Sequence, residues 1–306
     1  MAMMLQQRIL APRFGKRIKA RFAIQCAYQR TTRKSSSESN RDRLRTIPVE
    51  EVKPPNAAYE SWCQGSMTGA LEPYYQKKEP AVFRQAVASA RAYNNWNDWD
   101  YIENIVDINT ICHVEVGGNY ATSERSDIRF GDYLAYLRFF EEKHGRAVDP
   151  QKIPSWPPNQ DLVYLAQNDV FAGMGQDFDV PDFCSNAMLG EGRIYNTMIW
   201  IGPYGCVSPM HFDPLDNILM QFVGVKHVWL FAPDKPVYAG TEGNQYNTSP
   251  INPEQPLDFD QYPLLADALP AFECILRPGD MLFIPKKWYH YVRTVETSVS
   301  VNAWWR

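Results

Sequence analysis

The sequence predicts a mainly β protein with N-terminal helices, whose C-terminal half closes into a two-sheet jelly roll, a double-stranded β-helix. Hydrophobic residues make up 45% of the 306 residues and aromatic residues 13%, enough to fill a sizeable core. The 23 prolines and 17 glycines are scattered along the chain, as expected where turns join many short strands. Beyond the proline-rich residues 154–158, short apolar runs follow one another without a helical pattern between them.

The C-terminal half, residues 151–306, consists of short apolar runs separated by turns. Gly202-Pro203 and Pro278-Gly279-Asp280 are typical turn sequences between such runs. About eight strands at this spacing, without a repeat of fixed period, favour a closed two-sheet barrel. The expected strands are residues 194–201, 207–212, 218–223, 225–231, 274–276, 281–284, 289–292 and 298–304.

Residues 46–150 are expected to form a helical region that packs on this barrel. Residues 83–93 are rich in helix formers and predict a helix, and the helical character is expected to dominate up to about residue 105. Residues 111–116 precede a pair of glycines and predict one short strand. Residues 130–144 predict a helix with one buried face, formed by the apolar residues at positions 130, 133, 134, 137 and 140.

The first 45 residues differ in composition from the rest of the chain. Residues 1–37 contain nine basic residues and no acidic one, and apolar residues recur among them at near-helical spacing. An arginine-rich, serine-containing, acid-free amphipathic start is typical of a mitochondrial transit peptide, which predicts a location in the mitochondrial matrix. Because Pro12 and Gly15 interrupt the helix, the alternative is a disordered basic tail that binds RNA or carries a nuclear signal, in the nucleus or cytoplasm.

The remainder of the chain is acidic. Without the nine basic residues of the tail, the formal net charge would change from −4 to −13. A body of this charge is not expected to make extensive contact with nucleic acid. No apolar run is long enough to predict a transmembrane helix, and six widely spaced cysteines without a CxxC pair predict buried free thiols. The sequence leaves the oligomeric state open, a homodimer included.

Residues 207–213 carry the strongest chemical signal. Side chains alternate between the two faces of a strand, so His211 and Asp213 are expected to project to the same side, into the barrel. His290, on a late strand, is the expected third ligand of a metal ion. Two histidines and one carboxylate leave three coordination positions open, the arrangement of non-haem Fe(II) oxygenases. Two positions would take a bidentate 2-oxo acid and the third O2, whereas a structural zinc site has no need of such vacancies.

Each part of this pattern has a simpler interpretation. A His-x-Asp sequence alone arises readily by chance in a chain with five histidines. A lone histidine in an apolar strand is more often a core residue with satisfied hydrogen bonds than a ligand. The other three histidines, His113, His144 and His227, lack a comparable setting and are interpreted as structural or surface residues.

Lys226 strengthens the interpretation as a metal site. It shares a strand face with Val228 and Leu230, and a buried lysine is costly unless it meets an anion. The far carboxylate of 2-oxoglutarate would supply that anion. Arg293 is a weaker candidate for this role because it lies on the opposite strand face from His290. The simpler alternative for Lys226 is an edge-strand lysine whose ammonium group reaches solvent.

Several segments of the C-terminal half carry specific motifs. They are Trp200-Ile-Gly-Pro, Ser208-Pro-Met-His-Phe-Asp-Pro214, Asn217, Gly224-Val-Lys226, Leu276-Arg-Pro-Gly-Asp-Met-Leu-Phe-Ile-Pro285, Trp288-Tyr-His290-Tyr-Val292 and Ser300-Val-Asn-Ala-Trp-Trp305. Together they resemble a JmjC domain, most closely the small cupin-like JmjC protein hydroxylases, which include an arginyl hydroxylase also described as a lysine demethylase. The resemblance is dense from Tyr164 to Trp305 and thinner in residues 80–83 and 114–117.

The resemblance implies a role for each matching position. His211, Asp213 and His290 would bind Fe(II), and one lysine, helped by polar neighbours, would hold the tail of 2-oxoglutarate. Tyr164 has a simpler alternative as a core tyrosine with a satisfied hydroxyl group. The positions implied to contact 2-oxoglutarate or to line its pocket are Lys226, Asn217, Ser208, Tyr164, Trp200 and, as the weakest match, Asn302.

The resemblance further implies an oxygenase that uses Fe(II), 2-oxoglutarate and O2. Hydroxylation of a protein or peptide side chain, arginine among the candidates, is the first expectation, because the sequence contains no reader domain or zinc module. Removal of a lysine N-methyl group uses the same chemistry, although a mitochondrial location argues against a histone substrate. Hydroxylation of a modified tRNA base, known among similar small JmjC proteins, is a further alternative. A catalytically silent cupin that only binds its ligand is the alternative of a different class, which the intact ligand set disfavours.

Overall fold

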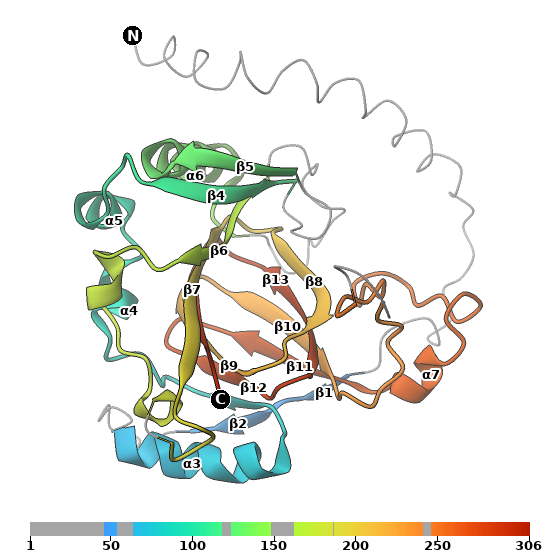
Figure 1. Cartoon of the computed structure of the whole chain (residues 1–306). Helices are drawn as coiled ribbons and strands as arrows, with labels where there is room; N and C mark the ends of the chain where they lie inside the picture. The colour runs from blue at the N-terminus through green and yellow to red at the C-terminus, as the bar shows by residue number, and fades with distance from the viewer. Residues whose placement is uncertain (1–45, 54–63, 118–123, 148–161, 186, 241–245) are drawn as a thin grey trace, which may run out of the picture. The chain divides into compact units, whose positions relative to one another are not determined.

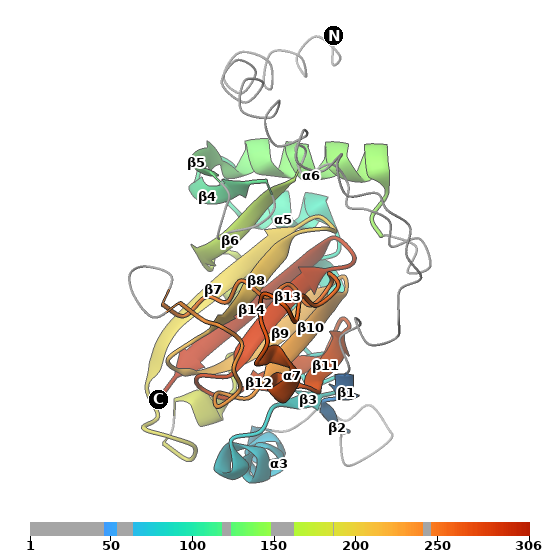
Figure 2. The same ribbon diagram turned by 90° about the vertical axis from the view of Figure 1, so that its right-hand side faces the viewer.

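Two β-sheets face each other and form the framework of the protein (Figure 1, Figure 2). The computed structural model describes residues 46–53, 64–117, 124–147, 162–185, 187–240 and 246–306. These residues belong to one compact unit. The expected transit peptide, residues 1–45, lies outside the described residues, so the peptide and the matrix location both stay predictions.

Each sheet combines strands that are far apart in the sequence, as in a jelly roll. The smaller sheet contains, in spatial order, β1 (Thr46–Pro48), β11 (Ala271–Leu276), β10 (Lys226–Phe231), β13 (Tyr289–Thr294) and β8 (Val207–Phe212). The larger sheet contains, in spatial order, β2 (Glu50–Val52), β3 (Ala81–Phe83), β12 (Met281–Ile284), β9 (Asp216–Val223), β14 (Ser298–Trp305), β7 (Ile194–Gly202), β6 (Val163–Asp169), β4 (Ile111–Val116) and β5 (Glu124–Arg129).

The mainly β jelly roll expected from the sequence is confirmed. All eight strands expected in the C-terminal half are present, with ends that differ from the expected ones by at most three residues, and β4 begins and ends as expected. The strands β1, β2, β3, β5 and β6 were not expected. They are short or polar: β5 has no buried residue, and β6 ends in Gln167, Asn168 and Asp169. Such strands form because their neighbours offer paired edges, which a hydrophobic pattern does not reveal.

Helices cover the outer face of the larger sheet. A single apolar core joins Leu134 of α6 and Trp96, the residue that follows α4, to Met220 and Phe222 of β9. The five apolar positions expected to form the buried face of α6 are all buried. Among the described residues, none of the helices is both long and apolar enough to cross a membrane. The helices are α3 (Gln64–Lys77), α4 (Arg91–Asn95), α5 (Trp99–Ile105), α6 (Phe130–His144) and α7 (Leu265–Ala268), with short 3-10 turns η3 (Met174–Gln176) and η4 (Asp182–Cys184).

The helix expected over residues 83–93 is wrong. Phe83 instead ends β3, where it pairs with Met281 of β12, and only the last part of the segment enters α4. Gln85 then adopts a left-handed φ of 58°, which no helix accommodates. Because β1, β2 and β3 precede residue 105, the expectation that this region is mainly helical is only partly correct.

The carboxylate of Asp280 explains why tertiary contacts override helix propensity here. Asp280 is only 2% exposed and accepts hydrogen bonds from the Arg84 guanidinium group and from the backbone N–H groups of Gln85 and Arg277. Arg84 also forms an ion pair with Glu51 of β2. The buried ion pair therefore fixes the chain next to β3 in an extended and turned conformation, which a helix could not share.

Asp280→Asn should therefore destabilise the fold. The variant keeps the shape of the side chain but loses the charge and one acceptor oxygen, so we expect the free energy of unfolding to fall by about 2–4 kcal/mol. Urea denaturation followed by circular dichroism measures this value. Asp100→Asn is the matched control: Asp100 also pairs with an arginine, Arg138, but its side chain is 83% exposed, and the expected loss is below about 0.5 kcal/mol. Equal stability of the two variants would contradict the interpretation.

Candidate metal centre and cosubstrate pocket

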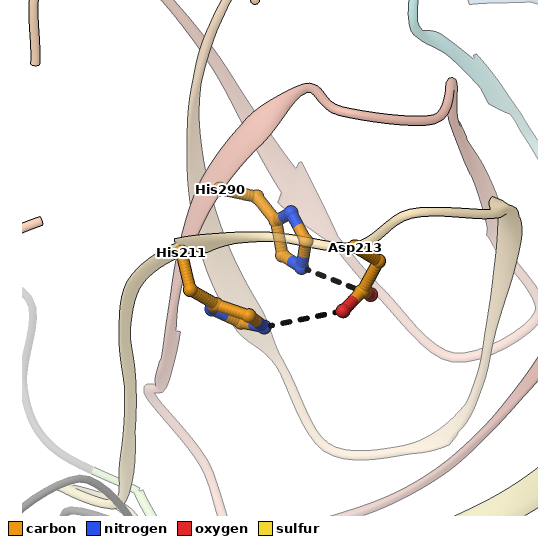
Figure 3. A group of neighbouring side chains, drawn as sticks. All are labelled: His211, Asp213 and His290. Atoms are coloured by element: carbon orange, nitrogen blue, oxygen red, sulfur yellow. Dashed lines mark ion pairs between the residues drawn. The ribbon is translucent and has the colours of Figure 1, made fainter. Parts of the chain in front are cut away.

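The antiparallel strands β8 and β13 position the three expected metal ligands. His211 on β8 is the direct cross-strand partner of His290 on β13, and the centroids of their rings lie 4.2 Å apart. Asp213 follows directly after β8. Its Oδ1 lies 3.9 Å from His211 Nε2, and its Oδ2 lies 3.7 Å from His290 Nε2. Figure 3 shows the three side chains converging, and their candidate ligand atoms all lie within 4.8 Å of one another.

Backbone carbonyl groups select the tautomer of both histidines. His211 Nδ1 lies 2.7 Å from the carbonyl oxygen of Pro209, and His290 Nδ1 lies 3.0 Å from that of Trp288. A carbonyl oxygen only accepts hydrogen bonds, so each Nδ1 carries the proton and donates it. Each Nε2 therefore keeps its lone pair, directed toward Asp213, as metal coordination requires.

Burial keeps His290 in the form that binds metals. The residue is 4% exposed, and burial together with the neighbouring His211 lowers its pKa to about 4. A histidine must be neutral to act as a metal ligand, so His290 is ready to coordinate at neutral pH. The donor set of two imidazole nitrogens and one carboxylate, with no fourth protein ligand among the described residues, fits a divalent transition metal such as Fe(II).

Two donors hold one oxygen of the Asp213 carboxylate. Trp304 Nε1 donates a hydrogen bond of 2.8 Å to Asp213 Oδ2, and Asn217 Nδ2 donates a longer one of 3.4 Å to the same atom. Both donors come from the larger sheet, whereas the ligands themselves come from β8, its extension and β13. The orientation of the carboxylate is therefore set from across the barrel.

Lys226, the first residue of β10, is buried within the barrel and only 2% exposed. Its Nζ lies 3.4 Å from the Tyr164 hydroxyl group and about 6 Å from the ring centroids of Tyr164 and Trp200 (6.0 and 5.9 Å). Burial lowers the pKa of Lys226 to about 7, and no carboxylate among the described residues opposes this effect. A buried cation that lacks a counter-charge fits a site that receives an anion.

A β-bulge turns Ser208 into the same interior. Residues three apart on a regular strand point to opposite faces, which would separate Ser208 from His211. The register shifts between these residues: His211 pairs with His290, but Ser208 pairs with Val292, so two residues of β8 oppose one of β13. Ser208 consequently lines the same cavity as His211, and its side chain hydrogen-bonds to Tyr164.

One cavity joins the metal ligands to Lys226. Eight of the nine site residues expected from the sequence line it, and the ninth, Tyr164, packs behind Trp200 with ring centroids 5.9 Å apart. Arg293 binds Glu254 on the outside of the smaller sheet, which confirms that it does not face the metal ligands. The cavity is lined by Gln167, Trp200, Ser208, His211, Asp213, Asn217, Leu219, Lys226, Ile284, His290, Val292, Asn302 and Trp304.

Five residues that line this cavity were not among the expected site residues: the apolar Leu219, Ile284 and Val292, and two with polar groups, Trp304 and Gln167. Trp304 could have been found, because it lies two residues after Asn302 on β14 and so shares its face. Gln167 could not, because it reaches the cavity from a position with a φ of 54° that no pattern indicates. Asn302 itself uses both ends of its amide on protein partners, Trp200 and Asn217, so its expected contact with 2-oxoglutarate stays a prediction.

The sequence is similar to those of a known family and of several known proteins. The family model described as a cupin-like domain matches residues 68–306. Lysine-specific demethylase JMJ30 of Arabidopsis thaliana is 33% identical over 246 residues, which cover 78% of this chain and 53% of that protein. Jumonji C domain-containing protein 5 of Drosophila melanogaster is 32% identical over 238 residues, which cover 76% of this chain and 55% of that protein. tRNA wybutosine-synthesizing protein 5 of Mus musculus is 33% identical over 149 residues, 49% of this chain and 44% of that protein.

The matched segments bear directly on the site. The family match begins at residue 68 and therefore includes every residue of the cavity. The chain spans about half the length of the curated relatives it matches. Because the family match covers most of the chain and contains the complete ligand set, this chain belongs to the family of cupin-like JmjC domain proteins.

Proposed function

We propose that this chain is an oxygenase that depends on Fe(II) and 2-oxoglutarate. The observation that carries the proposal is the shared cavity, which contains an incomplete metal coordination set and, separately, a buried lysine without a carboxylate partner among the described residues. A structural metal site would need neither open coordination positions nor a second buried cation. 2-Oxoglutarate matches both features, since it has a chelating 2-oxo acid at one end and a carboxylate at the other.

The three ligands would hold the metal through His211 Nε2, His290 Nε2 and the Asp213 carboxylate. When bound, Fe(II) and 2-oxoglutarate supply the oxidising chemistry with O2, and succinate and CO2 are released as the cosubstrate is consumed. The contribution of the protein is geometric and electrostatic. Both histidines are fixed in the ligating tautomer by the carbonyl groups of Pro209 and Trp288, so they need not reorganise when a metal arrives.

Lys226 would bind the distal carboxylate of 2-oxoglutarate. The ammonium group lies among the Tyr164 hydroxyl group and two aromatic rings, in a region closed to solvent. In such surroundings a charge pair is much stronger than in water. An arriving carboxylate favours the charged lysine and therefore raises its pKa from the value near 7. Tyr164 and Ser208, which are already hydrogen-bonded to each other, would complete the anchor with neutral groups.

A protein or peptide side chain is the substrate class that we favour, arginine among the candidates. The acidic charge of residues outside the basic tail attracts a cationic polypeptide and repels a phosphate backbone. The names of the relatives support two alternatives: those of the lysine-specific demethylases favour removal of an N-methyl group, and that of the tRNA wybutosine-synthesizing protein favours a modified tRNA. A non-catalytic binding protein is disfavoured by the complete ligand set.

Asp213→Ala should abolish turnover of 2-oxoglutarate. Loss of the only carboxylate in the ligand set removes the charge that neutralises the metal and leaves two histidines alone. We expect succinate formation by the iron-loaded protein to fall by at least about 100-fold. Asp234→Ala, which removes an exposed carboxylate, is the control and should keep its rate. Undiminished succinate formation by a folded Asp213→Ala variant would refute the proposed centre.

Lys226→Met should stabilise the protein in the absence of its cosubstrate. Because the pKa of Lys226 is lowered in the folded state, the unfolded chain binds more protons between pH 7 and the ordinary lysine pKa. The unfavourable contribution of the lysine is therefore complete below pH 7 and disappears as the pH rises toward the ordinary lysine pKa, about 10.4. At pH 6 we expect the variant to be more stable by about 2–4 kcal/mol, with a smaller difference at pH 9, as measured by urea denaturation.

The same variant separates the effect of Lys226 on stability from its role in binding 2-oxoglutarate. With Mn(II) already present in both samples, addition of 2-oxoglutarate should raise the melting temperature of the wild-type protein but not that of Lys226→Met. Lys77→Met, at an exposed position of α3, should change neither the pH dependence nor the response to 2-oxoglutarate. If Lys226→Met is no more stable than wild type at pH 6, burial of the lysine is not costly. If the variant still responds to 2-oxoglutarate, Lys226 is not the anchor.

The substrate class can be tested with the iron-loaded protein, 2-oxoglutarate and a panel of basic peptides with unmodified arginine or methylated lysine. We expect mass spectrometry to detect the gain of one oxygen atom on a peptide side chain, and no gain in the Asp213→Ala variant. Loss of a methyl group with release of formaldehyde would instead support demethylation. If tRNA is added to the same assay, oxidation confined to the tRNA would contradict a polypeptide substrate.

A further inference from the structure

A continuous set of side-chain hydrogen bonds runs from the lysine end of the cavity to the metal ligands. Trp200 Nε1 lies 2.7 Å from Asn302 Oδ1, and Asn302 Nδ2 lies 3.3 Å from Asn217 Oδ1. Asn217 Nδ2 lies 3.4 Å from Asp213 Oδ2. Trp200, Asn302 and Asn217 come from three adjacent strands of the larger sheet, β7, β14 and β9, and the two asparagines are at most 4% exposed.

The direction of these hydrogen bonds is fixed at both ends by chemistry. An indole N–H can only donate, so the oxygen of the Asn302 amide must face Trp200. The nitrogen of Asn302 then faces Asn217 and requires an oxygen there. The remaining nitrogen of Asn217 consequently points toward Asp213, which as a carboxylate can only accept. Neither amide can be turned over without placing two acceptors or two donors against each other.

We propose that Trp200, Asn302 and Asn217 form a positioning chain that orients the Asp213 carboxylate for metal binding from the cosubstrate end of the cavity. The inference rests on the metal centre of the proposed function. Trp304 donates to the same oxygen, Oδ2, so two independent donors occupy it. Oδ1, which lies on the His211 side, is left as the oxygen that ligates the metal.

The chain links two binding events. The centroid of the Trp200 ring lies 5.9 Å from Lys226 Nζ, beside the expected position of the cosubstrate carboxylate. Within the chain of hydrogen bonds, Trp200 bonds to Asn302 and not to Asp213 itself. The two amides therefore carry a change at Trp200 to the metal ligand by hydrogen bonds, beside the packing of Trp304 against the apolar cluster that contains Trp200. Because coupling between binding sites is reciprocal, metal binding and 2-oxoglutarate binding should each strengthen the other through this chain.

Metal affinity measured without 2-oxoglutarate tests the chain. Co(II) is a suitable probe because its visible absorption reports ligand geometry as well as occupancy. Trp200→Phe removes the indole N–H and keeps an aromatic ring near Lys226, and we expect Co(II) to bind about tenfold more weakly. The strengthening of Co(II) binding by 2-oxoglutarate should also decrease in this variant.

Asn302→Asp distinguishes orientation from simple charge. The variant accepts from Trp200 but cannot donate, so Asn217 turns its nitrogen toward position 302 and its oxygen toward Asp213. The chain therefore predicts weaker Co(II) binding and a changed absorption spectrum. An added negative charge acting only through space would instead strengthen the binding of a cation.

Trp305→Phe is the matched control. Trp305 is fully buried on β14 next to Trp304, and its indole N–H also donates a hydrogen bond, but to the Leu189 carbonyl group, away from the metal ligands. We expect its Co(II) affinity to stay within about twofold of wild type. Circular dichroism establishes that each variant is folded.

The outcomes separate this inference from the proposed function. Weaker binding in Trp200→Phe or Asn302→Asp, but not in Trp305→Phe, supports the chain even if the wild-type protein does not turn over 2-oxoglutarate. Wild-type affinity and an unchanged spectrum in a folded Trp200→Phe variant overturn the chain even if turnover is observed. A wild-type protein that binds no Co(II) overturns the metal centre and the chain together.

Discussion

The pairing of β8 with β13 is the contact on which the candidate site depends. It places His211 opposite His290, and the bulge in the same ladder turns Ser208 toward them. The outer face of this ladder is held by a buried ion pair between Arg293 and Glu254 and by an apolar cluster around Met210. Packing on the outside therefore fixes the register, which leaves the inner face free to carry polar groups.

The two sheets divide the chemical tasks. The smaller sheet and the residue that follows β8 supply the charged groups: the metal ligands and the lysine. The larger sheet supplies neutral donors that orient them, from Trp200, Asn217, Asn302 and Trp304. Helices pack on the outer face of the larger sheet, and the apolar core that they share with it makes that sheet a rigid support. These hydrogen bonds can orient the Asp213 carboxylate only if their donors are held rigidly.

The polar interior is costly before any ligand binds. Burial lowers the pKa of Lys226 and of His290, which means that the barrel disfavours a charge on either residue. An apolar residue at position 226 would pack the same space at lower cost. On the proposed function, Lys226 lowers the stability of the unliganded protein, and binding of 2-oxoglutarate would stabilise the folded state in return.

The sequence by itself determined most of the jelly roll and the identity of the candidate ligands. Strand periodicity set His211 and Asp213 on one face, the cost of burying Lys226 indicated an anionic partner, and motif resemblance tied His290 to the same barrel. These signals are local and need no knowledge of neighbouring strands. The tertiary structure alone decided the rest. Residues 83–93 lost their helix to a buried contact with Asp280, Ser208 entered the cavity through a bulge, and Trp304 met Asp213 from another sheet. Each of these depends on a partner distant in the sequence, and local preferences of a few tenths of a kcal/mol per residue, up to about 1 kcal/mol, yield to buried polar contacts that contribute more.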